Sequence, residues 1–110
     1  GMDSVARFLN MQVRAGTPLE SLDMALIVHG GAAKDLLTDA AYRERFEVDN
    51  PNTGLLGGLA KAGVTIYLCG QTASYRGFAP GDLNPAVTMA LSAMSAHVQL
   101  QSDGYTLIPF

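Results

Sequence analysis

Cysteine, histidine and charged residues are all scarce in this chain. Its 110 residues include one cysteine and two histidines, and only 15% are Asp, Glu, Lys or Arg, against about 25% in an average domain. A single cysteine excludes an internal disulfide. His29 and His97 lie too far apart in sequence for a spaced Cys/His metal site, so we expect no metal and no other cofactor.

Long apolar runs and basic clusters are missing as well. The longest apolar runs have five residues, Met24 to Val28 among them, whereas about 20 are needed to cross a bilayer. The start lacks the basic-then-apolar pattern of a signal peptide, so a cytoplasmic location is the default expectation. The net charge is −3 without any basic block. Neither a membrane nor a nucleic acid is therefore an expected partner.

Apolar residues, in contrast, are plentiful. They make up 48% of the chain, which is enough for a core and argues against disorder. Because so little charge accompanies them, we expect another copy of the chain to cover part of the apolar surface. The length fits one domain. We expect that domain to span residues 2–110, because Gly1 ahead of Met2 resembles a cleavage remnant.

Apolar spacing and turn signals predict helices that alternate with short strands. We expect helices over 3–16, 33–37, 40–46, 53–62, 70–76 and 92–101, and strands over 22–29, 64–68, 87–90 and 105–110. The unbroken run Met24 to Val28 is typical of a parallel strand covered on both faces. This order predicts an α/β fold with a mainly parallel sheet and right-handed crossovers. The chain opens on a helix, and four strands are few for such a sheet, which again favours oligomerisation.

Two polar residues follow strand ends, where ligands of parallel α/β sheets bind. His29 ends the first predicted strand and Cys69 follows the second. Gly70 and Gln71 then begin a helix, whose unpaired N–H groups and positive dipole end lower a thiol pKa. Cys69 is thus either a reactive thiol, with Arg76 adding positive charge, or a packed strand-end cysteine.

The segment from Cys69 to Arg76 can be compared with the C-x5-R phosphate loop of cysteine-dependent phosphatases. Here six residues separate the two, and the extra residue turns Arg76 by about 100° on a helix. We therefore do not expect phosphatase chemistry.

The remaining polar candidates have structural explanations too. His29 could orient the thiol or simply bond a loop carbonyl, and Arg76 could pair with Asp82 or contact another subunit. Asn50 and Asn52, on either side of Pro51, are predicted as turn and helix-capping residues. His97 is expected on a surface or in an interface, without a catalytic role.

Taken in order, several segments of the chain resemble one family. They are Val28-His29-Gly30, Asn50-Pro51-Asn52, Ile66-Tyr67-Leu68-Cys69 with Ala73 and Arg76-Gly77, Leu91-Ser92-Ala93-Met94, Gly104-Tyr105 and Pro109-Phe110. The chain is similar in these to the DsrE/DsrF/TusD-like sulfur-relay proteins, and most of all to their uncharacterised DsrE-like branch. The resemblance covers nearly the whole chain from Asp3 onwards.

The resemblance implies a flavodoxin-like α/β/α sandwich, here without the first strand usual in relatives, and a homotrimer or homohexamer. It also implies a persulfide on Cys69 that passes to a partner protein, with sulfur-donor or sulfur-acceptor proteins as partners. We therefore expect a sulfur carrier or sulfurtransferase, with Gly70, Gln71, Arg76 and His29 as binding or activating residues. Two alternatives stay open: a non-catalytic binding or structural oligomer, and a thiol redox sensor.

Overall fold

A computed structural model describes residues 2–16 and 23–107 of the chain. Its centre is a three-stranded sheet in the order β1-β2-β3, formed by β1 (Ala25–Val28), β2 (Thr65–Cys69) and β3 (Val87–Ala90). Both pairs of strands are parallel, with Ala25 opposite Thr65 and Cys69 opposite Ala90. The expected α/β fold with a parallel sheet is confirmed.

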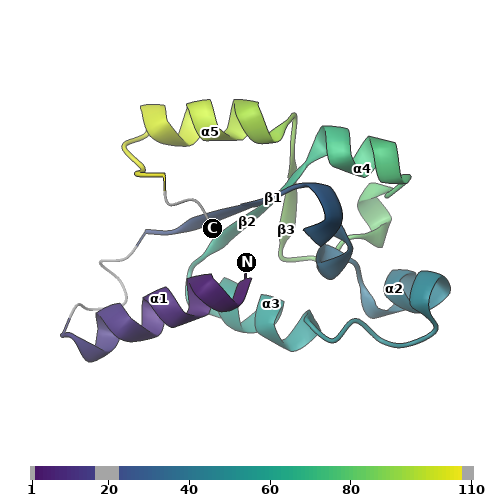
Figure 1. The fold of residues 1–110 in the computed structure, drawn as a ribbon, viewed down its shortest axis with the longest axis horizontal. Helices are drawn as coiled ribbons and strands as arrows, with labels where there is room; N and C mark the ends of the chain where they lie inside the picture. Colours follow the sequence, from purple (N-terminus) through teal and green to yellow (C-terminus); the bar gives the residue numbers. More distant parts are fainter. Residues whose placement is uncertain (1, 17–22, 108–110) are drawn as a thin grey trace.

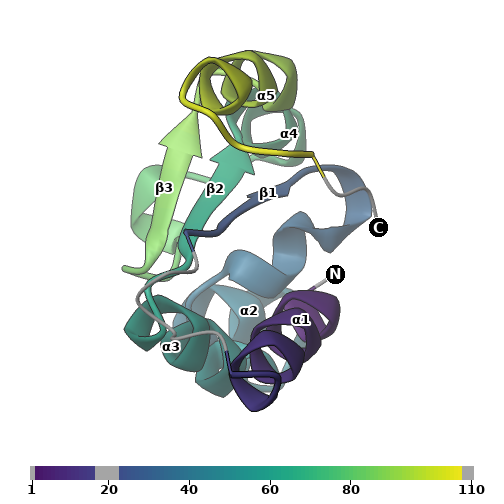
Figure 2. The same cartoon turned by 90° about the vertical axis from the view of Figure 1, so that its left-hand side faces the viewer.

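Helices cover both faces of the sheet, which gives three layers (Figure 1). The helices and 3-10 turns follow in chain order: α1 (Met2–Arg14), η2 (Gly30–Leu36), α2 (Asp39–Phe46), α3 (Thr53–Lys61), α4 (Gly70–Arg76), η3 (Pro80–Asp82) and α5 (Ala93–Ser102). Figure 2 shows α1 and α3 on one side of the sheet and α4 and α5 on the other. No helix in the described residues is long and apolar enough to cross a membrane.

The two faces of the sheet are covered unequally. The core lies on the α1 and α3 side, where Val5 and Leu56 pack with the fully buried Ile66 and Leu68 of the central strand. Burying one such side chain is worth about 1.5–3 kcal/mol. On the other side, α5 buries only Ala96. Much of the apolar surface of α5 is therefore exposed.

Asn50 fixes the loop that precedes α3. Its side chain is buried, and Nδ2 donates to the carbonyl oxygens of Asp35 and Leu37, each at 2.8 Å. Its Oδ1 accepts a bond from the N–H of Asn52 at 2.9 Å. Asn52 stands at the N-cap of α3, but its side chain makes no capping bond. The prediction that the Asn52 side chain caps this helix is therefore wrong: its backbone, with φ −100° and ψ 0°, is not in the extended conformation usual for a capping residue.

The predicted last strand is also wrong where it can be assessed. Tyr105 to Leu107 form no strand, and residues 108–110 lie outside the described part. The Tyr105 N–H donates to the Leu100 carbonyl, and its hydroxyl donates to Asp23 Oδ1, both at 3.0 Å. These bonds hold the segment beside the end of α5, and a cavity separates it from β1, so it has no adjacent strand to pair with.

Candidate functional site

Cys69 lies at the carboxyl edge of the sheet, where β2 ends and α4 begins. Its side chain is buried, with about 5% of the residue exposed. A cavity of about 790 Å³ opens beside it, between α4, α5 and the loop after β1. The residues around this cavity are His29, Gly30, Cys69, Gln71, Thr72, Tyr75, Arg76, Ala93, Met94, His97 and Val98. The thiol is thus shielded by protein yet borders an open cavity.

The surroundings of Cys69 favour its thiolate. Burial raises the pKa of the thiol, but hydrogen bonds from the backbone and hydroxyl of Thr72 and from the N–H groups of Ala93 and Gln71 lower it. The net effect is a pKa below the ordinary value of a cysteine. Because the thiolate is the nucleophilic form, this cysteine is suited to attack an electrophilic sulfur.

Thr72 connects the two strand ends that form the site. Its Oγ1 accepts a hydrogen bond from the N–H of Gly30 at 3.2 Å, while the same hydroxyl stabilises the Cys69 thiolate. The loop after β1 is therefore tied to the first turn of α4 through the group that tunes the thiol.

Replacing Thr72 with valine should raise the pH at which Cys69 becomes reactive. The change removes one donor to the thiolate, so deprotonation needs a higher pH, closer to the value of about 8.5 for a free cysteine. The rate of alkylation by iodoacetamide, followed from pH 5 to 10, measures this midpoint. Thr72→Ser keeps the hydroxyl and should titrate like the parent protein; equal midpoints in all three proteins would contradict the assigned role.

Gly70 is required by the close packing of two backbone segments. A Cβ at this position would lie 2.5 Å from the Ala90 carbonyl oxygen and 3.0 Å from that of Leu91. Such contacts are too short, and both atoms belong to the backbone, which cannot easily move. Because glycine has no side chain, the start of α4 can approach the end of β3, and this brings the Ala93 N–H to the thiol.

The end of α4 fixes the position of Arg76. Gly77 adopts a left-handed conformation with φ of +72°, and the Phe78 N–H donates to the Ala73 carbonyl at 2.8 Å. This pair of features is a typical C-terminal stop. Arg76 borders the cavity and is exposed. The alternative of an ion pair with Asp82 is wrong, because Arg76 makes no ion pair with any of the described residues. The Asp82 carboxylate instead accepts a hydrogen bond from the Ala79 N–H.

The other predicted residues also surround the cavity. His29 follows β1 at the N-cap of η2, where its side chain is exposed and makes no capping bond. Gln71 is exposed and contributes its backbone N–H toward the thiol. The structure thus brings His29, Cys69, Gln71 and Arg76 to one cavity.

Three features of the site were not predicted from the sequence. Thr72 and Ala93 supply donors to the thiol, and His97, half-buried on α5, borders the cavity instead of lying only on an outer surface. The prediction that α5 starts at Ser92 is confirmed: Ser92 is the N-cap residue, and its Oγ accepts a hydrogen bond from the Ser95 N–H at 3.0 Å. That cap sets the helix register, but only the tertiary arrangement places α5 over the carboxyl end of β2.

An exposed apolar rim surrounds the mouth of the cavity. It consists of Tyr75 on α4 and Met94 and Val98 on α5, which are 89%, 81% and 67% exposed. Apolar side chains gathered around a site often mark an interaction surface. Within the part of the chain that the structure describes, no group of three or more His, Cys, Asp or Glu residues could hold a metal ion.

Fold and site together define an α/β protein with one polarised cysteine at the carboxyl edge of a parallel sheet. The model of the DsrE/DsrF-like family matches residues 1–110, and the chain belongs to this family. Among solved structures it is similar to the "Protein of Unknown Function MTH1491 from Methanobacterium thermoautotrophicum". The two share 20% identity and a TM-score of 0.71 over 94% of this chain and 85% of that chain, which is a likeness of fold. The comparison with curated proteins gave no match.

Proposed function

We propose that the chain handles sulfane sulfur through a persulfide on Cys69, as a carrier or a sulfurtransferase, with residues 2–110 acting as one domain. The observation that carries the proposal is the buried thiol beside an open cavity, with a pKa lowered by converging hydrogen-bond donors. Family membership points the same way, because sulfur relay is associated with the DsrE/DsrF-like family.

The proposed loading step needs only the thiolate and a donor. The Cys69 thiolate attacks the outer sulfur of a donor such as thiosulfate, the sulfur–sulfur bond of the donor breaks, and sulfite leaves with the electron pair. Cys69 then carries a persulfide anion. An acceptor thiolate attacks the terminal sulfur in the second step, and Cys69 leaves as a thiolate. No metal, external oxidant or general base takes part.

The neighbouring residues have supporting roles in this scheme. The N–H groups of Gln71 and Ala93 and the hydroxyl of Thr72 stabilise negative charge on the Cys69 sulfur. Arg76 and His29 border the same cavity and would hold an anionic donor near the thiol. Gly70 permits the close packing that brings these donors together.

Intact mass spectrometry of the reduced protein, after incubation with thiosulfate or a small-molecule persulfide, tests the proposal. A gain of whole sulfur atoms that a reductant removes would support it. No gain, together with slow alkylation of the native thiol and fast alkylation in denaturant, would favour a non-catalytic binding or structural protein. A stable sulfenic acid or intersubunit disulfide after mild peroxide, without sulfur loading, would favour a redox sensor.

We also propose that the chain forms a homotrimer or homohexamer through the apolar rim, because the chain carries so little charge and the rim is so exposed. Met94→Glu should then lower the mass in solution measured by light scattering. Met11 is a matched control: it is 66% exposed on α1, on the opposite side of the sheet (Figure 2), so Met11→Glu should leave the mass unchanged. A monomeric parent protein at micromolar concentrations would contradict this part of the proposal.

A further inference from the structure

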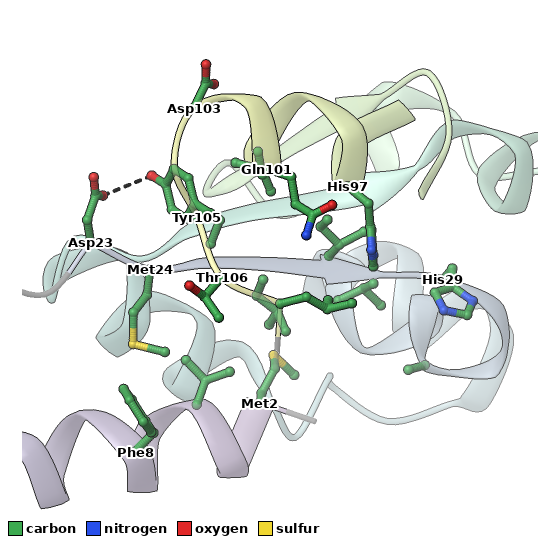
Figure 3. Close-up of a pocket in the computed structure, with 18 of the residues that line it drawn as sticks. Met2, Phe8, Asp23, Met24, His29, His97, Gln101, Asp103, Tyr105 and Thr106 are labelled. Atoms are coloured by element: carbon green, nitrogen blue, oxygen red, sulfur yellow. Dashed lines mark hydrogen bonds between the residues drawn. The ribbon is translucent and has the colours of Figure 1, made fainter. Parts of the chain in front are cut away.

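A second cavity, of about 830 Å³, runs along the outer edge of β1 (Figure 3). Every residue from Asp23 to His29 borders it, and the segment from Gly104 to Leu107 forms its far wall. In the described residues β1 pairs only with β2, so its other edge faces this cavity. An unpaired strand edge is a template for pairing with another extended chain.

The backbone groups that face the cavity can be assigned. The Thr65 N–H donates to the Met24 carbonyl at 3.0 Å, so Met24 points its backbone groups toward β2. Because direction alternates along a strand, Leu26 and Val28 do the same. The N–H and C=O groups of Ala25 and Ile27 therefore point away from β2, into the cavity. They offer two donors and two acceptors to an added strand.

The walls of the cavity suit an extended segment with apolar side chains on both faces. Met2, Val5 and Phe8 of α1 form the lower wall, and Leu100 and His97 of α5 contribute to the upper one. Side chains of an added strand would point alternately toward these two walls. Four residues of strand span about 13 Å, which is the length of β1 itself.

Charge sets the direction of that segment. Asp23 and Asp103 lie at the amino end of β1 (Figure 3), and no Lys or Arg borders the cavity in the described residues. The third acidic residue of the cavity, Asp35, follows the carboxyl end of β1 in η2, and its carboxylate lies 3.6 Å from the Lys34 ammonium group, which offsets its charge. The hydrogen bond to Asp23 raises the pKa of Tyr105, and burial and the charges of Asp23 and Asp103 raise it further. Negative potential at this end favours positive charge on the adjacent end of an added strand. A segment whose basic residues stand at its amino end satisfies this when it runs parallel to β1.

We propose that the β1 edge is a docking site for an extended peptide segment of a partner protein, apolar on both faces and basic at its amino end, which pairs with Ala25 and Ile27 as a parallel strand. This is binding by strand addition. The added strand would lie away from the thiol, because neither Cys69 nor Thr72 borders this cavity; His29 and His97 border both cavities.

Binding of a fluorescein-labelled peptide with two lysines followed by four valine and isoleucine residues tests the docking site. Fluorescence anisotropy should show saturable binding to the full chain, and a peptide with glutamates for the lysines should bind several-fold more weakly. Hydrogen exchange should show new protection of the Ala25 and Ile27 amides when the lysine peptide is bound. Bound peptide without that protection would overturn the proposal.

Three variants distinguish strand pairing from nonspecific hydrophobic binding. Ile27→Pro removes the N–H that an added strand needs, a change that edge strands tolerate, and should abolish peptide binding, whereas Ile27→Val should bind like the parent. Asp23→Asn should weaken binding about threefold, as for an exposed charge pair, and it checks the proposal if Ile27→Pro does not fold. If folded Ile27→Pro binds the peptide as well as the parent does, or if Asp23→Asn does, the proposal is overturned. Protection of the Ala25 and Ile27 amides that appears without peptide as the protein concentration rises would also overturn the proposal, because it would identify a second copy of the chain as the occupant.

Discussion

Replacing Cys69 with serine is expected to abolish sulfur loading completely. The chain has no other cysteine, and a serine hydroxyl does not ionise near neutral pH, so no nucleophile is left to take a sulfur atom from the donor. In intact mass spectra after incubation with thiosulfate, the parent protein should gain sulfur and the variant none. Loss of the thiol removes the reaction itself, so a partial effect is not expected.

The serine variant must also keep its fold for that result to have meaning. Serine is close to cysteine in size, and its hydroxyl can accept the same donors from Thr72 and Ala93. Circular dichroism and the mass in solution should therefore match the parent protein. Sulfur gain by Cys69→Ser would exclude Cys69 as the acceptor. Loss of both fold and loading would leave the parent's own sulfur gain and alkylation to decide.

Parts of the fold that depend on local patterns could be predicted from the sequence. The predicted strand over 87–90 matches β3, and the helices predicted near α2, α3 and α5 begin within about a residue of their positions. Two of the helices, α2 and α5, also have a clear start, at Thr38 and Ser92, whose side chains each accept a hydrogen bond from a backbone N–H in the first turn. Pattern and cap agree there, so local and tertiary preferences coincide.

Features that depend on distant partners could not be predicted in this way. Tyr105 to Leu107 has the composition of a strand but pairs with none in the described residues, because a cavity lies between it and β1. A strand needs a neighbour, and composition does not show which edge is within reach. Asn50 likewise makes its side-chain bonds to the carbonyl oxygens of Asp35 and Leu37, which lie 15 and 13 residues away along the chain.

The same distinction holds for the candidate site. Cys69 could be identified from its place between an apolar strand and a helix start, and Gln71 and Arg76 follow it closely in sequence. Gly30 and Ala93 are remote in sequence, yet one bonds the Thr72 hydroxyl and the other contributes a donor to the thiol. Their contributions come from the parallel pairing of β2 with both neighbours, which brings three strand ends to one edge.

Replacing Gly70 with alanine should destabilise the protein by about 3 kcal/mol, at the upper end of what overpacking costs. Its Cβ would lie 2.5 Å from the Ala90 carbonyl oxygen, so either α4 or the segment after β3 must move. Thermal and urea unfolding measure the loss. Movement of that segment would also withdraw the Ala93 N–H from the thiol, so alkylation of Cys69 at neutral pH should slow.

The same substitution elsewhere in the chain should act in the opposite direction. Gly57 is an exposed residue inside α3, and a Cβ there would meet no atom within 4 Å. Gly57→Ala should therefore stabilise the protein by about 0.5–1 kcal/mol, because alanine is the better helix former. It should leave the alkylation rate of Cys69 unchanged. If the two alanine variants unfold alike, the close approach at Gly70 does not hold the site together.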